Sequence, residues 1–78
     1  MRPKILVVED DTAIRKLIHM FLEKSGFQSF AAMSAEAALD VLKDQEIGIV
    51  LTDVQLPGMN GLELTKIIRN TYNADVII

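Results

Sequence analysis

The residues of this chain whose types and spacing could do chemistry are carboxylates that directly follow apolar runs. Asp53 closes the run Ile-Val-Leu-Thr and precedes a Pro-Gly turn and a second glycine, in the segment IVLTDVQLPGMNG at residues 49–61. Glu9, Asp10 and Asp11 close another run, Ile-Leu-Val-Val, near the amino terminus. Asp53 could serve as a nucleophile or as a metal ligand. It could equally be a turn residue, because Asp hydrogen-bonds to nearby backbone.

The apolar runs in front of these acids predict the strands that would position them. Residues 47–52 form an apolar, largely β-branched run that ends at turn-forming residues, which is typical of a parallel strand buried on both faces. Residues 5–8 predict a strand of the same kind, the first in the chain. Open α/β sheets bind ligands beyond the carboxyl ends of their strands. If these two strands are neighbours, with the strand order reversing around the first, then Glu9, Asp10 and Asp53 converge.

Three converging carboxylates repel one another, so we expect a cation to compensate them. An all-oxygen site that keeps some of its waters suits a hard divalent ion, with Mg²⁺ the first candidate. The alternative is that the acids at 9–11 are solvated loop residues at the mouth of a helix, where the helix dipole favours negative charge. Asp53, at the matching end of another predicted strand, favours the metal site.

The other segments predict three helices and two further strands. Asp11 or Thr12 caps a first helix that stops at Gly26, and Ser34 caps a second helix. The apolar face of the first helix is formed by Ile14, Leu17, Ile18, Phe21 and Leu22, and that of the second by Ala35, Ala38, Leu39 and Leu42. The remaining elements are an edge strand at 27–32, a third helix at about 61–70 after the Pro57-Gly58 turn, and a fourth strand at 76–78. His19 lies off the apolar face, so we expect it at the solvated surface.

These elements alternate from strand to helix along the whole chain, which predicts a single α/β domain. The alternation calls for a parallel sheet with right-handed crossovers and helices on both faces. The last strand, at residues 76–78, would be an uncovered edge with no helix after it, and such hydrophobic edges invite association. We therefore expect the 78 residues to be a fragment of a longer domain.

Composition argues against several classes of function. The formal net charge of -3 argues against direct binding of nucleic acid, which needs a basic patch to neutralise phosphates. The chain has no cysteine, which excludes disulfides and thiolate metal sites and fits a reducing compartment. The apolar run at 5–8 is too short for a signal peptide or a membrane span. We expect a soluble, cytoplasmic protein without a membrane partner.

Two separated motifs together resemble the receiver domain of bacterial two-component response regulators. They are ILVVEDD at residues 5–11, and LTD at 51–53 with LPGMNG at 56–61. The resemblance extends over the whole chain and implies a flavodoxin-like, doubly wound parallel sheet. It also implies that Asp53 accepts a phosphoryl group from a histidine kinase or phosphotransfer protein. Such a domain is a signalling module rather than an enzyme, and at most it catalyses its own phosphotransfer and dephosphorylation.

The resemblance further implies the roles of individual ligands to Mg²⁺. Asp10 is similar to the direct metal ligand of the acidic pair, and Glu9 to the member that reaches the metal through water. Asp53 would be nucleophile and ligand together. The third protein ligand would be the backbone carbonyl of Gln55, two residues past the acceptor.

The chain also departs from the family pattern. Many receivers have Asp at the position of Glu9. Receivers use a Ser or Thr at the end of the fourth strand and a Lys at the end of a fifth, whereas this chain ends at Ile78, and Lys4 and Lys66 are not at matching positions. We therefore expect residues 1–78 to be a partial receiver domain, an incomplete flavodoxin-like sheet lacking the fourth helix, the fifth strand and the fifth helix. It would bind metal and accept phosphate poorly, and would self-associate through its uncovered sheet.

Two rival interpretations start from the same acids. A haloacid-dehalogenase-type aspartyl phosphatase also uses an Asp nucleophile with Mg²⁺, but it needs a second Asp two residues further on as general acid. That position is Gln55, whose carboxamide cannot transfer a proton. The other rival is a non-phosphorylatable structural or self-associating fragment in which the acids are vestigial. Three repelling carboxylates in one place, which no fold by itself requires, count against it.

Overall fold

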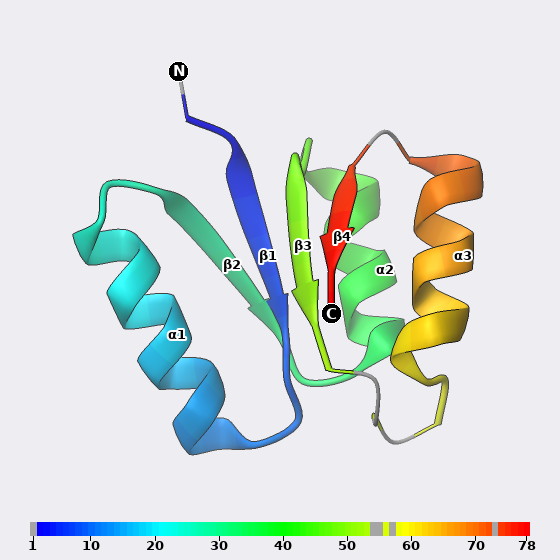
Figure 1. Cartoon of the computed structure of the whole chain (residues 1–78), viewed down its shortest axis with the longest axis horizontal. Helices are drawn as coiled ribbons and strands as arrows, with labels where there is room; N and C mark the ends of the chain where they lie inside the picture. The colour runs from blue at the N-terminus through cyan, green and yellow to red at the C-terminus, as the bar shows by residue number, and fades with distance from the viewer. Residues whose placement is uncertain (1, 54–55, 57, 73) are drawn as a thin grey trace.

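The computed structural model describes residues 2–53, 56, 58–72 and 74–78, which form a four-stranded parallel sheet with helices on both faces (Figure 1). The elements are β1 (Lys4–Val8), α1 (Thr12–Lys24), β2 (Gln28–Ala32), α2 (Ala35–Asp44), β3 (Ile49–Thr52), α3 (Gly61–Thr71) and β4 (Asp75–Ile77). The predicted α/β alternation is confirmed, with bounds that differ from the predicted ones by one or two residues.

The strand order is β2-β1-β3-β4, so the order reverses around β1. β1 pairs with β3 in a register that places Ile5 opposite Ile49 and Val8 opposite Thr52. The condition for the acids to converge is therefore met, because the carboxyl ends of β1 and β3 lie side by side. β2 is an edge strand, as predicted, and β4 forms the other edge.

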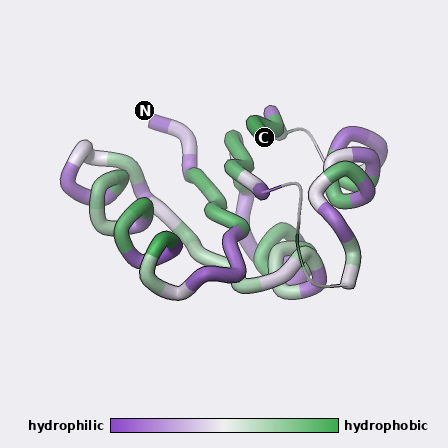
Figure 2. Tube along the Cα trace, turned by 60° about the horizontal axis from the view of Figure 1, so that its bottom comes forward, coloured by the Kyte–Doolittle hydropathy of each residue, from purple (hydrophilic) through white to green (hydrophobic). Residues whose placement is uncertain are grey.

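Both faces of β1 are buried, as its uninterrupted apolar run predicts. The central strands are mostly hydrophobic along their length, which Figure 2 shows in green. Leu6 and Val8 belong to the core beneath α2 and α3, whereas Ile5 and Val7 belong to a second core beneath α1. Successive side chains of a strand point to opposite faces, so one strand supplies both cores.

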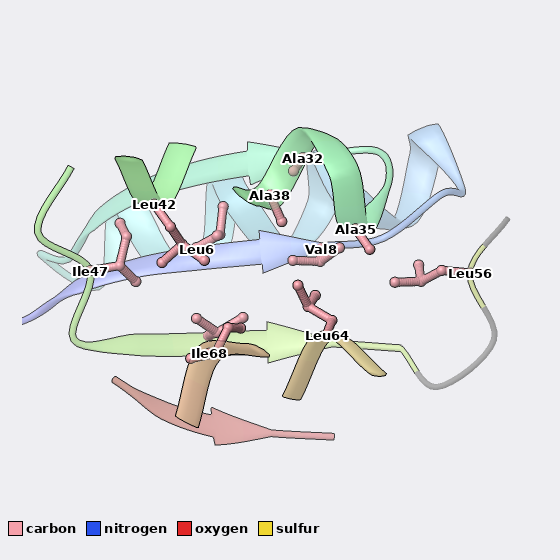
Figure 3. Close-up of a cluster of buried hydrophobic side chains, with 11 residues drawn as sticks. Leu6, Val8, Ala32, Ala35, Ala38, Leu42, Ile47, Leu56, Leu64 and Ile68 are labelled. Carbon is pink, nitrogen blue, oxygen red and sulfur yellow. The ribbon is translucent and has the colours of Figure 1, made fainter. Parts of the chain in front are cut away.

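The larger core lies between the sheet and the helices α2 and α3 (Figure 3). Each helix contributes small or branched residues at helical spacing, and Leu64 and Ile68 of α3 are fully buried. The predicted packing residues of α2 also lie here, with Ala35, Ala38 and Leu42 buried and Leu39 packed at the margin.

The core beneath α1 is much smaller, and only part of the predicted apolar face of α1 reaches it. Leu22 is buried and Ile18 is half-buried, but Ile14, Leu17 and Phe21 are 47%, 62% and 68% exposed. The apolar face of α1 is wider than the strip of sheet that α1 covers, so these three side chains lie beyond that contact. The periodicity predicted which residues share a face, but not how much of that face the described residues would cover.

His19 also differs from its prediction. It is half-buried, and its Nδ1 is buried without a hydrogen-bond partner among the described residues. Glu23, one turn further along the same side of α1, accepts a hydrogen bond from the backbone N–H of Ser29 in β2. α1 is thus rotated so that the flank carrying His19 turns toward the edge strand, rather than toward solvent.

Side-chain caps begin all three helices. Asp11 caps α1 by accepting from the N–H of Ile14, so the predicted choice between Asp11 and Thr12 is settled. Ser34 caps α2, as predicted, and Asn60 caps α3. Among the described residues, no helix is long and apolar enough to cross a membrane.

The core beneath α3 gives a direct test of the packing. Replacing Leu64, which is fully buried, by Ala should lower the free energy of unfolding by about 2–5 kcal/mol through lost burial and a residual cavity. The control is Leu62→Ala on the same helix, where the side chain is 54% exposed and the change should stay within about 0.5 kcal/mol. Urea unfolding followed by circular dichroism measures both, and equal losses in the two variants would contradict the assignment of Leu64 to the core.

Candidate functional site

Three carboxylates gather at the carboxyl end of the sheet. Glu9, Asp10 and Asp53 each offer an oxygen, and these three oxygens lie within 4.8 Å of one another. Glu9 is half-buried, while Asp10 and Asp53 are exposed. The sequence prediction that these side chains converge is therefore confirmed, whereas their chemical roles remain predictions.

The backbone of the central strands holds two of these acids in place. The N–H of Asp53 donates to the carbonyl of Val8 at 3.3 Å, which continues the β1–β3 pairing beyond the strand end. The N–H of Glu9 donates to the carbonyl of Ala32 at 3.0 Å, on the β2 side. The two acids are thus set by the pairing of β1 with both of its neighbours.

Asp11, the third acid of the amino-terminal run, has a different role. Its Oδ1 accepts from the N–H of Ile14 at 3.0 Å and so caps α1. Its own N–H donates to Oε2 of Glu9 at 3.3 Å. The interpretation as an acid at the mouth of a helix therefore describes Asp11, and the metal-site interpretation fits the other two acids.

Three contacts hold the described residues between Asp53 and α3. Leu56 is buried in the larger core, where Figure 3 shows it beside Ala35 and Leu64. Glu36, at the start of α2, accepts from the N–H of Met59 at 3.4 Å, and its carboxylate lies against Gly58, which has a φ of +76°. Asn60 then caps α3 by accepting from the N–H of Glu63 at 2.9 Å.

Two contacts of this loop bear on the sequence predictions. The contact of Glu36 with this loop has no signal in the local sequence. Gln55, whose backbone carbonyl is the predicted third metal ligand, and Pro57 lie outside the described residues. The hydrogen bond from Met59 therefore shows how the following part of the loop is fixed, not where that carbonyl lies.

The neighbouring acids affect the pKa of Glu9. Partial burial raises the pKa of its carboxyl above the ordinary value of 4.5, and the Asp10 side chain and the charge of Asp53 raise it further. Backbone N–H groups of Asp10 and Asp11 act in the opposite direction. The ionised form of Glu9 is therefore less favoured here than in water. Its all-carboxylate donor set fits a hard divalent cation such as Mg²⁺.

An apolar groove of about 330 Å³ runs from these acids along the face of the sheet beside α1. Its walls come from α1 and from the three strands β1, β3 and β4. The lining residues are Val7, Val8, Glu9, Ile18, Leu51, Thr52, Asp53, Ile77 and Ile78. The carboxylates thus stand at one end of a largely hydrophobic surface.

The raised pKa of Glu9 predicts how stability depends on pH. The folded chain keeps this proton to higher pH than the unfolded chain, so this group makes stability fall as pH rises from 4.5 through its raised pKa. In metal-free buffer, Glu9→Gln should remove that fall and raise the free energy of unfolding at neutral pH. Urea unfolding over a pH series measures it, with Glu46→Gln, an exposed acid beyond the end of α2, as control. A less stable Glu9→Gln at neutral pH would show that the ionised carboxylate stabilises the fold.

The comparisons with known proteins agree with this geometry. The family model of the response regulator receiver domain matches residues 5–78. The response regulator protein FleR of Pseudomonas aeruginosa is 43% identical over 72 residues, which are 92% of this chain and 15% of FleR. This chain therefore spans a small part of that curated relative.

Two solved structures extend the comparison. The response regulator TrrA of Thermotoga maritima, in complex with Mg(2+)-BeF, has a TM-score of 0.87 and 31% identity, covering 99% of this chain and 68% of that one. A second match, with a TM-score of 0.82 and 28% identity, is the co-crystal structure of the Saccharomyces cerevisiae histidine phosphotransfer protein Ypd1 and the receiver domain of Ssk1. It covers 88% of this chain and 48% of the matched one.

The match over nearly the whole chain coincides with the features that the structure brings together. These are a parallel sheet whose order reverses at β1 and acids at the ends of β1 and β3. The fold is the flavodoxin-like α/β fold of the matched receivers. This chain belongs to the response regulator receiver domain family, whose members receive the signal in a phosphorelay.

Proposed function

We propose that this chain accepts a phosphoryl group on Asp53 from a histidine kinase or a phosphotransfer protein, with the help of Mg²⁺. The observation that carries the proposal is the convergence of Glu9, Asp10 and Asp53 within 4.8 Å at the carboxyl ends of neighbouring strands. An exposed carboxylate at this position is open to a donor that arrives from outside.

Asp53 is the nucleophile in this proposal. One of its carboxylate oxygens attacks phosphorus, a new O–P bond forms, and the N–P bond to the donor histidine breaks. Asp10 would bind Mg²⁺ directly, Glu9 would bind it through a water, and Asp53 and the carbonyl of Gln55 would complete the protein ligands. Bound Mg²⁺ supplies positive charge that offsets the repulsion between carboxylate and phosphoryl oxygens.

The proposed partner is the phosphoryl donor, inferred from the chemistry of the site and from the similarity to solved receiver domains. The matched structure of Ypd1 with the Ssk1 receiver domain supports a histidine phosphotransfer protein as one class of donor. We place the exchange in the cytoplasm, with which a chain free of cysteine is compatible. The domain has no separate substrate to turn over, and its own catalysis is limited to phosphotransfer and dephosphorylation. The family match does not favour the haloacid-dehalogenase-type phosphatase.

Intact mass after incubation with Mg²⁺ and acetyl phosphate tests the acceptor. The wild-type chain should gain one phosphoryl group, and Asp53→Asn should gain none because the amide is not a nucleophile. Asp11→Asn is the matched control, because it removes a neighbouring acid that caps α1 and leaves a side chain that also caps well. A wild-type chain that is folded by circular dichroism and gains no mass would contradict the proposal, as would a gain in Asp53→Asn.

A second proposal concerns the apolar face beside α1, which we assign to contact with another copy of this chain. Leu17 and Phe21 of α1 are exposed, and Ile77 and Ile78 at the β4 edge are 55% and 57% exposed. Ile77 pairs with Leu51, which packs on the α1 side, and Ile77 and Ile78 line the groove together with Ile18 of α1. Contiguous exposed apolar surface of this kind marks association sites, and β4 adds an unpaired strand edge.

Sedimentation at micromolar concentration tests this contact. The wild-type chain should sediment as a dimer or larger species. Phe21→Glu should shift it to monomer, because it places a charge on the surface that the contact between two copies would bury. Leu62→Glu, at a leucine of α3 that is 54% exposed, is the control and should leave the distribution unchanged. Only compact monomer in the wild-type sample would rule the contact out.

A further inference from the structure

Arg15 reaches back from α1 over the turn that carries the acidic pair. One guanidinium nitrogen, Nη1, donates to the backbone carbonyl of Glu9 at 2.9 Å and lies 3.5 Å from that of Asp10. The other, Nη2, lies 3.4 Å from Oγ1 of Thr12. Arg15 is half-buried, so its guanidinium group lies against the turn rather than extending into solvent.

These contacts act on the part of the turn that the sheet does not hold. The amide side of Glu9 is fixed by the ladder through its bond to Ala32, but Asp10 comes after that bond. Arg15 holds the carbonyl side of both acids. The direction of a carbonyl and that of its own side chain are linked through the shared backbone, so fixing the carbonyls restricts where the carboxylates point.

We propose that Arg15 is a positioning residue for the acidic cluster, holding the Glu9 and Asp10 carbonyls so that their carboxylates can bind a divalent cation together with Asp53. The inference rests on the proposed function, since the cation it serves is the Mg²⁺ of phosphoryl transfer. Arg15 acts through the backbone and does not itself touch the metal.

The charge of Arg15 and its positioning role predict opposite effects on Mg²⁺ affinity when the side chain is replaced. A guanidinium close to a cation site repels the cation, so loss of its charge alone would tighten Mg²⁺ binding. Loss of an outer contact that orients ligands weakens metal binding, commonly by 10- to 100-fold. Two of the three carboxylates are exposed, so we expect the lower end, roughly a tenfold weakening.

Calorimetric titration with Mg²⁺ at constant ionic strength separates the effect of charge from the effect of positioning. Arg15→Gln should bind Mg²⁺ about tenfold more weakly than the wild-type chain. Lys16→Gln, which removes the same charge from the exposed next residue of α1, should bind it as well as the wild-type chain or slightly better. Equal or tighter binding by Arg15→Gln would overturn the proposal, as would equal weakening in both variants.

A measurement without metal keeps this inference separate from the proposed function. The N–H of Asp11 donates to the Glu9 carboxylate, so its hydrogen exchange, followed by NMR, reports whether that carboxylate keeps its direction. In metal-free Arg15→Gln, this amide should exchange several-fold faster, while amides of β1 and β3 stay protected and show that the fold is intact. Unchanged exchange at Asp11 would overturn the role of Arg15, even if the wild-type chain bound no Mg²⁺.

Discussion

The structure depends on the parallel pairing of β1 with β3. This pairing places Val8 opposite Thr52, so the first residues beyond the two strands, Glu9 and Asp53, emerge side by side. β1 is buried on both faces and contributes side chains to both cores, which means that a shift of its register would disturb the packing on each face. The same contact thus specifies the fold and assembles the carboxylates.

Gathering negative charge at this point opposes folding. The raised pKa of Glu9 shows that burial and the neighbouring acids disfavour its ionised form. The larger core beneath α2 and α3, with Leu64 and Ile68 fully buried, offsets such a cost by removing apolar surface from water. Packing on the α2–α3 face of the sheet thus offsets the repulsion between the acids at the strand ends.

The two faces of the sheet differ in a way that matters for recognition. The α2–α3 face is closed by a continuous core, whereas the α1 face carries a small core and an open apolar groove that leads to the acids. Leu56 and Met59, which follow Asp53 in the chain, are held on the closed face by the core and by Glu36. Asp53 itself lines the open groove on the other face.

The sequence by itself determined the order of the elements, the doubly buried strands, the Ser34 cap and the position of Asp53 at a strand end. These features depend on residues close together in the chain, through periodicity, turn formers and capping side chains. The motifs that end at Glu9, Asp10 and Asp53 are local as well, so the sequence identified which acids would gather, while their chemical roles remain predictions.

Only the tertiary structure decided which side of α1 the sheet covers, and it thereby exposed Leu17 and Phe21 and turned His19 inward. It also brought Glu36 to the β3–α3 loop. Each of these outcomes depends on the rotation of a helix about its axis, or on a contact between segments far apart in the chain. Local sequence patterns do not determine such rotations and contacts, because packing against the other elements sets them.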